Sequence, residues 1–488
     1  MLKLKDEALL RADAYADGAW QPAGDGGRFA VTDPATGETI AEVADLGEAE
    51  TRRAIAAAHA AYPAWRKKTA KERAALMRKW YELILANQED LARIMTAEQG
   101  KPLAETRGEV AYGAAFIEWF AEEGKRVYGD VIPTPQASRR IIVLKEPVGV
   151  VAAITPWNFP NAMITRKAAP ALAAGCTFLI KPAAETPLSA LALAELAHRA
   201  GIPAGVFNVL PTKKPSKVGG ELTQSPLIRK FSFTGSTEIG KLLMRQCAST
   251  VKKVSLELGG NAPFIVFDDA DLDAAADGAM LSKFRNMGQT CVCANRLLVQ
   301  DGVYQAFAEK LAARMAKLKL GSGFDDGVTQ GPLINEDAVV KVEALIKDAT
   351  GKGAKLSLGG KRSALGHTFF EPTLLRDVTP EMRIAREEIF GPVATLFRFK
   401  TDDEAIALAN DTEYGLAAYF YARDVGRVWR VAEALEYGIL GINEGIISTE
   451  VAPFGGMKES GTGREGSKYG IEDYLEIKYL ALGGLGGA

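Results

Sequence analysis

The stretch Gly149-Val150-Val151-Ala152-Ala153-Ile154 is an apolar run of β-strand length, and an amphipathic stretch follows it at residues 164–174. Further apolar runs lie at residues 178–180, 206–210 and 231–233, and the alternation with helical patterns continues to residue 247. This alternation is typical of βαβ units, which build a parallel sheet with helices on both faces. We therefore expect an α/β protein with a parallel, doubly wound sheet in this part of the chain.

The regions on either side of these units are also patterned. Residues 48–127 carry apolar side chains three and four positions apart, which predicts helices. A second α/β stretch begins near Gly259. Residues 130–146 and 474–480 have a β pattern without an obvious partner, so we expect them to pair with each other or with another subunit.

Composition favours a small molecule as the partner. The 488 residues include 59 Lys plus Arg against 61 Asp plus Glu, so no strong net charge is available to hold nucleic acid or an anionic membrane. The first 20 residues lack the apolar segment of a signal peptide, and four irregularly spaced cysteines do not form a disulfide framework. We expect a cytoplasmic protein in a reducing compartment.

Two of the cysteines lie in the segment Gly288-Gln289-Thr290-Cys291-Val292-Cys293. Buried packing is one interpretation, since free cysteine is among the most buried residue types. A thiol becomes a nucleophile when a nearby group lowers its pKa or takes its proton. Glu257 is the only carboxylate in an apolar, strand-like run, and it is either a solvated strand-end residue or a buried base that activates water.

Two further segments have patterns suited to binding. Asn158 follows a predicted strand between two prolines, where its amide either forms a turn or stabilises an oxyanion. Residues 233–240 join a predicted strand to a helix, a position where backbone N–H groups bind pyrophosphate. A GxGxxG match at residues 461–466 follows no apolar strand, so we expect a flexible loop there.

Together these segments resemble the aldehyde dehydrogenase superfamily, from Asn158 through Glu257 and Cys291 to Glu388-Ile389-Phe390-Gly391-Pro392. The resemblance covers nearly the whole chain. It implies the α/β aldehyde dehydrogenase fold and a homodimer or homotetramer. The implied parts are a Rossmann-type cofactor-binding domain (1–127 and 148–258), an α/β catalytic domain (259–460) and a small β oligomerisation arm (128–147 and 470–488).

The resemblance also implies roles for individual residues. Cys291 is the implied nucleophile, Glu257 the base, and Asn158 with the Cys291 backbone N–H the oxyanion hole. Thiolate attack on an aldehyde gives a tetrahedral oxyanion, whose collapse expels hydride to the nicotinamide and leaves a thioester for water to hydrolyse. The implied NAD(P)-binding positions are Thr155, Trp157, Lys181, Ala184, Glu185, Gly235, Ser236, Gly240, Glu388 and Phe390.

Within the superfamily the chain most resembles the succinate-semialdehyde dehydrogenases. That resemblance rests on residues 163–167, 283–286 and 441–449. It implies that Arg166, Arg285 and Ser448 bind the distal carboxylate of the aldehyde, because guanidinium groups hold carboxylates bidentately. We expect succinate semialdehyde as the substrate. Glutarate semialdehyde and a broad range of aldehydes are alternatives, because one methylene is worth only about 1–3 kcal/mol of discrimination.

Ala184 bears on the choice of cofactor. NAD-preferring relatives tend to place an acid at this position, where it holds the ribose 2′-OH and repels a 2′-phosphate. Ala184 lacks that repulsion and Lys181 can pair with the phosphate, so NADP is favoured. If Glu185 turns inward it restores the preference for NAD, so NAD stays possible.

Three other classes of protein match parts of this sequence. A P-loop hydrolase matches GxxxxGK at residues 235–241, but Leu242 follows and offers no hydroxyl to Mg²⁺. A metal or redox protein would need more ligands beside Cys291 and Cys293, and the three histidines do not stand at ligand spacing, so no metal is expected. A catalytically silent structural homologue would be expected to have lost Cys291 or Glu257, and an assay with aldehydes discriminates it.

Cys293 is either a core residue or a redox partner of Cys291. Some succinate-semialdehyde dehydrogenases have a disulfide switch at the matching pair, so the resemblance implies that mild oxidation links the two cysteines. A disulfide needs Cα atoms about 4.4–6.8 Å apart, which residues two apart reach only where the loop bends. Gly288 favours such a bend.

Overall fold

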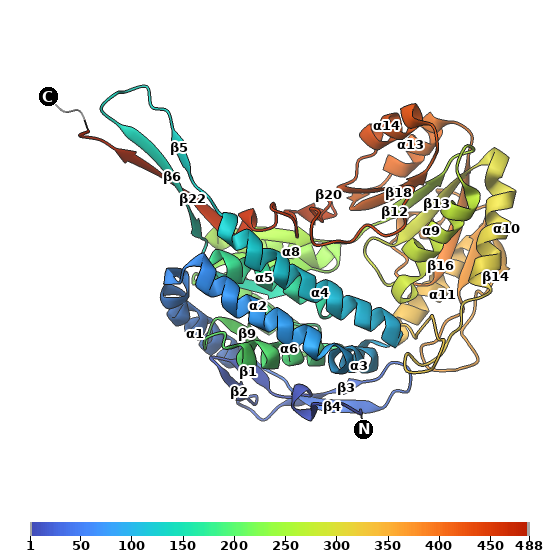
Figure 1. The fold of residues 1–488 in the computed structure, drawn as a ribbon. Coiled ribbons are helices and arrows are strands. Elements are labelled where there is room, and N and C mark those ends of the chain that lie inside the picture. The colour runs from blue at the N-terminus through green and yellow to red at the C-terminus, as the bar shows by residue number, and fades with distance from the viewer. Residues whose placement is uncertain (1, 486–488) are drawn as a thin grey trace.

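The computed structural model describes residues 2–485, which fold around two large sheets that lie side by side (Figure 1). The first sheet has eight strands in the order β2-β1-β9-β8-β7-β10-β11-β21. The second has seven strands in the order β14-β15-β16-β13-β12-β18-β19. A three-stranded sheet, β22-β6-β5, projects away from the first sheet like an arm.

The centre of the first sheet is parallel, as predicted for a doubly wound α/β protein. Strands β7, β8, β9, β10 and β11 pair in parallel, whereas β1, β2 and β21 add antiparallel edges. Helices cover both faces, so the central strands are nearly continuous apolar runs. The strands are β1 (Ala14–Ala16), β2 (Ala19–Gln21), β7 (Val150–Ile154), β8 (Thr177–Lys181), β9 (Phe207–Val209), β10 (Ile228–Thr234), β11 (Lys253–Glu257) and β21 (Gly461–Thr462).

The helices predicted between residues 48 and 127 are present. Thr69 begins one of them with a capping box, accepting from the Glu72 N–H. Another ends at Gly100, whose φ of 93° suits glycine. The helices of this first unit are α1 (Glu48–Lys67), α2 (Ala70–Ala86), α3 (Gln88–Gln99), α4 (Leu103–Glu123), α5 (Ala162–Ala174), α6 (Pro187–Ala200), α7 (Pro215–Gln224) and α8 (Thr237–Cys247).

The first strand of the second sheet is β12, which begins at Ala262. The strands of this second unit are β12 (Ala262–Val266), β13 (Ala294–Gln300), β14 (Lys355–Leu358), β15 (Thr373–Arg376), β16 (Val393–Phe399), β18 (Ala417–Tyr421) and β19 (Ile439–Ile442). Its helices are α9 (Leu272–Phe284), α10 (Tyr304–Met315), α11 (Glu336–Gly351), α12 (Arg383–Arg386), α13 (Asp402–Asn410) and α14 (Val425–Ala434). The remaining strands are β3 (Arg28–Thr32), β4 (Thr39–Ala44), β17 (Tyr414–Gly415) and β20 (Met457–Lys458). No helix within residues 2–485 is long and apolar enough to cross a membrane.

The two unpartnered β segments pair with each other. Strand β6 (Arg140–Pro147) lies between β5 (Asp130–Ile132) and β22 (Leu475–Leu482), and both pairings are antiparallel. Most side chains of the arm are exposed, including large apolar ones at Val131 and Ile477. The arm therefore presents apolar surface that residues 2–485 do not cover.

The GxGxxG segment is not the flexible loop that its sequence suggested. Residues Gly461–Thr462 form strand β21, which pairs with Leu256 and Glu257 of β11. A Cβ on Gly461, whose φ is 128°, would meet the Leu256 carbonyl oxygen at 1.9 Å. The glycine therefore permits a close approach of two backbones.

Candidate active site

Cys291 lies between two cavities. The arginine pocket, of about 300 Å³, contains Arg166 and Arg285 together with Cys291. The glycine pocket, of about 350 Å³, contains Gly235 and Ser236 and reaches Cys291 from the other side. Cys291 thus lines two separate cavities.

An unusual turn carries Cys291 into this position. Asn286, Met287 and Gly288 have successive φ values of 51°, 57° and 73°. Such a left-handed conformation costs about 1–3 kcal/mol for each non-glycine residue unless its surroundings hold it. The Asn286 N–H donates to Glu105 Oε2 at 2.9 Å, which ties the turn to α4. A Cβ on Gly288 would meet the Gly391 carbonyl oxygen at 2.3 Å, so the turn is also tightly packed.

The Cys291 thiol needs a base before it can act as a nucleophile. Burial raises its pKa to about 12, although the nearby Arg166 opposes that shift. Glu257, at the end of β11, is a buried carboxyl whose pKa is well above its ordinary value because of burial and the charge of Glu465. Among the described residues, Glu257 Oε2 has no hydrogen-bond partner. The carboxylate form of such a group is a stronger base than an ordinary, solvent-exposed carboxylate.

Asn158 is held firmly beside Cys291. Its Nδ2 donates to the Gln289 carbonyl at 3.1 Å, and its backbone carbonyl accepts from Asn286 Nδ2 at 3.0 Å and from Lys101 Nζ at 2.7 Å. Its Oδ1 is buried without a partner in the part of the chain that the structure describes. The amide therefore lies where it can contact a ligand in the glycine pocket.

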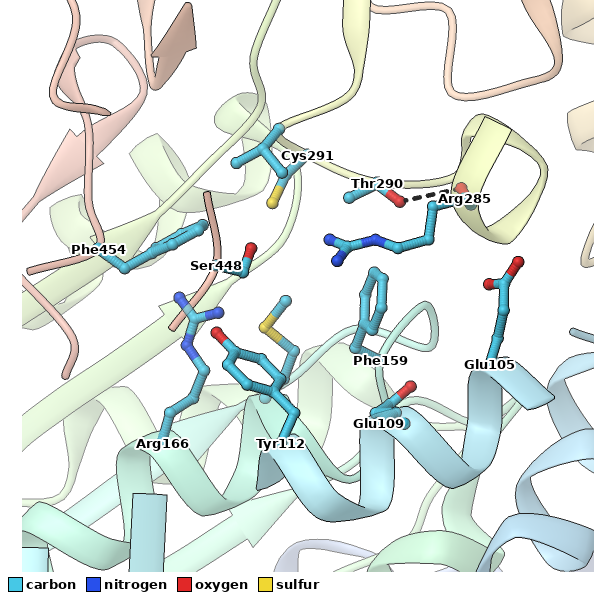
Figure 2. Close-up of a pocket in the computed structure, with 13 residues that line it drawn as sticks. Glu105, Glu109, Tyr112, Phe159, Arg166, Arg285, Thr290, Cys291, Ser448 and Phe454 are labelled. Atoms are coloured by element: carbon cyan, nitrogen blue, oxygen red, sulfur yellow. Dashed lines mark hydrogen bonds between the residues drawn. The ribbon is translucent and has the colours of Figure 1, made fainter. Parts of the chain in front are cut away.

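The arginine pocket brings together the three residues that the resemblance assigned to the substrate carboxylate. Figure 2 shows Arg166, Arg285 and Ser448 converging on the space that the Cys291 sulfur faces. Arg166 comes from α5, Arg285 follows α9, and Ser448 lies between β19 and β20. The Arg285 guanidinium lies over the ring of Phe159, 5.2 Å from its centre, which limits its freedom.

Arg166 is not a free cation. Its Nε donates to the buried carboxylate of Glu465, which also binds Lys167. Burial would raise the pKa of Glu465, but Arg166 and Lys167 hold that pKa below its ordinary value. Nη2 of Arg166 is buried and, among the described residues, lacks a partner. The ion pair thus fixes the guanidinium and leaves Nη2 for a ligand.

The glycine pocket contains several of the predicted cofactor positions. Ser236 caps α8, and Trp157 packs edge-on against Phe390 with ring centres 5.6 Å apart. Burial raises the pKa of Glu388 to about 7, and its Oε1 accepts from the Gly260 N–H at 3.1 Å. The predicted residues that line this pocket are Trp157, Asn158, Gly235, Ser236, Glu388 and Phe390.

The other predicted cofactor residues line neither pocket. Lys181 and Thr155 lie at the carboxyl edge of the parallel sheet, where Ile154 pairs with Lys181. Lys181 Nζ donates to the Pro182 carbonyl, and burial lowers its pKa to about 8. Glu185 is exposed. The others are Ala184, which is half-buried, and Gly240, where a Cβ would meet Leu258 at 2.4 Å.

Sequence reasoning missed one wall of the arginine pocket. Glu105, Gly108, Glu109 and Tyr112 line it from α4 (Figure 2). Their spacing of three and four residues places them on one helix face, which is the signal that was available. Their partners lie far away in the sequence, so the pattern alone did not distinguish them from core or surface residues.

Cys293 lies outside both pocket linings. It is buried, and its Sγ donates to the Lys283 carbonyl at 3.3 Å. All four cysteines are free.

The sequence and the fold of this chain are similar to those of known proteins. The aldehyde dehydrogenase family model matches residues 20–480. The chain belongs to the aldehyde dehydrogenase family. A crystal structure titled as an NADP-dependent enzyme of Escherichia coli has a TM-score of 0.98 and 65% identity, and the match covers 99% of this chain and 100% of that one. The α/β fold inferred from the sequence is therefore confirmed.

The curated relatives of this aldehyde dehydrogenase family member have different substrates in their names. A 3-sulfolactaldehyde dehydrogenase of Pseudomonas putida is 65% identical, and a glutarate-semialdehyde dehydrogenase of Pseudomonas aeruginosa is 66% identical. The NADP-dependent succinate-semialdehyde dehydrogenase GabD of Escherichia coli is 65% identical. Each match covers 99% of this chain and 100% of the relative. All three names describe aldehydes that also carry an anionic group.

Proposed function

We propose that this protein oxidises succinate semialdehyde to succinate, with NADP as the favoured cofactor and NAD as a possible second one. The observation that carries the proposal is that Arg166, Arg285 and Cys291 line one cavity of about 300 Å³. A thiol nucleophile and two guanidinium groups in one small space suit an aldehyde with a distal carboxylate.

Each predicted site residue has a separate role in the proposed reaction. Arg285, Arg166 and Ser448 bind the carboxylate and so direct the aldehyde carbon toward Cys291. Glu257 takes the proton of the Cys291 thiol and releases it to solvent. The thiolate adds to the carbonyl, and the resulting oxyanion is stabilised by the Asn158 amide and the Cys291 backbone N–H. After hydride loss, Glu257 takes a proton from the water that hydrolyses the thioester.

The glycine pocket fits a nicotinamide dinucleotide. Thr234 Oγ1, which lines it, is buried and has no partner within residues 2–485, so a polar ligand would satisfy it. Gly235 and Ser236 precede the N-terminus of α8, where a pyrophosphate is stabilised. When bound, the nicotinamide dinucleotide would supply the hydride acceptor. Glu388 would hold its nicotinamide ribose, and Phe390 would pack beside it.

NADP is favoured because Ala184, the residue expected at the ribose, has no acidic side chain. Ala184 is half-buried and has no charge, while Glu185 is exposed. Lys181, at the end of β8, would pair with a 2′-phosphate. The NADP-dependent GabD of Escherichia coli, at 65% identity, supports this preference.

Glutarate semialdehyde is the second candidate. A relative with that name is as similar as the succinate-semialdehyde enzyme, at 66% against 65% identity. The two aldehydes differ by one methylene, which a pocket discriminates by about 1–3 kcal/mol at most.

We also propose a homodimer or homotetramer in the cytoplasm. The exposed apolar side chains of the arm, including Val131, Ile477 and Tyr479, support an oligomer because a second copy would cover them. Light scattering of the purified protein measures the assembly directly.

The experiment compares aldehydes on wild type and Arg285→Ala by NADPH formation. We expect the highest kcat/KM for succinate semialdehyde, and a KM in the variant that rises far more for it than for uncharged propanal. A wild type inactive on every anionic aldehyde with both cofactors would contradict the proposed function. Equal losses on both aldehydes would remove Arg285 from the substrate site.

A further inference from the structure

The Tyr112 hydroxyl is an unused hydrogen-bonding group in the arginine pocket. Its oxygen is buried and, among the residues that the structure describes, has no hydrogen-bond partner. Tyr112 lines the same cavity as Cys291 and both arginines. Buried hydroxyls without a protein partner are uncommon, and a ligand is one explanation for them.

The ring of Tyr112 is held in place. It packs edge-on against the fully buried Phe116, with ring centres 5.0 Å apart and planes at 75°. It also packs against the small apolar cluster of Phe159, Ala162 and Met163. The hydroxyl therefore points to one place in the pocket, and little side-chain entropy is lost when it binds a ligand.

A second unpartnered donor lies on the neighbouring helix. Arg166 Nη2 is buried without a partner among the described residues, while its Nε is occupied by Glu465. Figure 2 shows the Tyr112 hydroxyl beside the Arg166 guanidinium, both directed toward Ser448. Two donors from α4 and α5 thus converge on the space into which the Cys291 sulfur points.

The phenol is a donor throughout the neutral range. Burial raises its pKa above the ordinary value, and the two arginines only partly oppose this shift. A protonated phenol donates to a carboxylate but offers nothing of similar strength to an alkyl chain.

We propose that the Tyr112 hydroxyl donates a hydrogen bond to the distal carboxylate of the substrate, beside Arg166, and thereby selects anionic aldehydes over uncharged ones. This assignment rests on the proposed function. It makes Tyr112 a specificity-determining residue supplied by the α4 wall.

The test is Tyr112→Phe, which removes one oxygen and keeps the ring. We expect KM for succinate semialdehyde to rise about tenfold or more, because a hydrogen bond to a charged group is lost. Inhibition by succinate should weaken by a similar factor, whereas kcat/KM for propanal should stay within twofold. Tyr128→Phe, which changes a largely exposed tyrosine, is the matched control and should change none of these values.

The outcomes separate the two proposals. If wild type does not oxidise succinate semialdehyde, the proposed function fails. If wild type does so and Tyr112→Phe leaves both KM and succinate inhibition unchanged, the hydroxyl does not contact the carboxylate. Equal losses on succinate semialdehyde and propanal would show that Tyr112 shapes the pocket instead, which also contradicts the assignment.

Discussion

Lys101 Nζ lies 2.5 Å from Glu109 Oε2 in an ion pair that is completely buried. The same ammonium group donates to the Asn158 carbonyl, and Glu109 Oε1 accepts from the N–H groups of Asn161 and Ala162 at the start of α5. One buried pair therefore positions both the backbone of Asn158, the proposed oxyanion donor, and the helix that carries Arg166.

Replacing Lys101 with Met tests this arrangement. Removing one partner of a buried pair leaves an uncompensated charge, so we expect the free energy of unfolding to fall by about 3–5 kcal/mol. We also expect kcat to fall, because the Asn158 carbonyl loses a donor. Denaturant unfolding measures the first effect and steady-state kinetics the second.

Lys310→Met is the matched control. Lys310 pairs with Asp273 at 2.8 Å, but both side chains are exposed to solvent. Its loss should cost less than about 1 kcal/mol. A Lys101→Met protein as stable as this control would show that the buried pair contributes nothing net.

The raised pKa of Glu257 predicts a pH dependence. Its carboxylate form is the proposed base, and burial raises the pKa well above the ordinary value. As pH rises through that raised pKa the carboxylate form increases, so kcat should climb over this range. Glu257→Gln should lower kcat by about 10²–10⁴-fold and remove this limb of the profile.

Glu42→Gln, which changes an exposed glutamate, is the control for the pH profile of kcat. It removes a carboxylate from β4 without touching either pocket. A limb that persists in Glu257→Gln would assign the titration to another group.

Ala184→Asp should change the cofactor preference. An acid at this position would repel a 2′-phosphate and hold a ribose 2′-OH, so the ratio of kcat/KM for NADP over NAD should fall about tenfold or more. Glu185→Gln, at the exposed neighbour, should leave the ratio unchanged. A ratio that responds to Glu185→Gln but not to Ala184→Asp would place Glu185 at the ribose.

Cys293 should protect Cys291 against peroxide. Peroxide converts the Cys291 thiolate to a sulfenic acid, which condenses with the Cys293 thiol to give a disulfide and water. The Cys293 Sγ now donates to the Lys283 carbonyl, so the loop must shift for the two sulfurs to meet. Wild type should lose activity with peroxide and regain it with dithiothreitol, whereas Cys293→Ala should lose it permanently.

Cys247→Ala is the control for that experiment, since Cys247 is a buried cysteine on α8. It should recover like wild type. Equal recovery of wild type and Cys293→Ala would make Cys293 a packing residue.

Local patterns were sufficient for most of the fold. Alternating apolar runs and helical periods between residues 149 and 247 predicted the parallel sheet, because each period reports which face of an element is buried. The same reasoning missed β1 and β2, since these two strands have only three residues each and carry too little pattern. It misinterpreted Gly461, whose role depends on a backbone distant in sequence.

The sequence by itself determined the fold class, the motif segments that include Cys291, Glu257 and Asn158, and the resemblance to the aldehyde dehydrogenases. Only the tertiary structure decided which charges meet. Arg166 is paired with Glu465, about 300 positions away, and Tyr112 faces the same pocket from α4. Such contacts depend on long-range packing and burial, which set both the free donors and the pKa values, and no local period of the sequence encodes them.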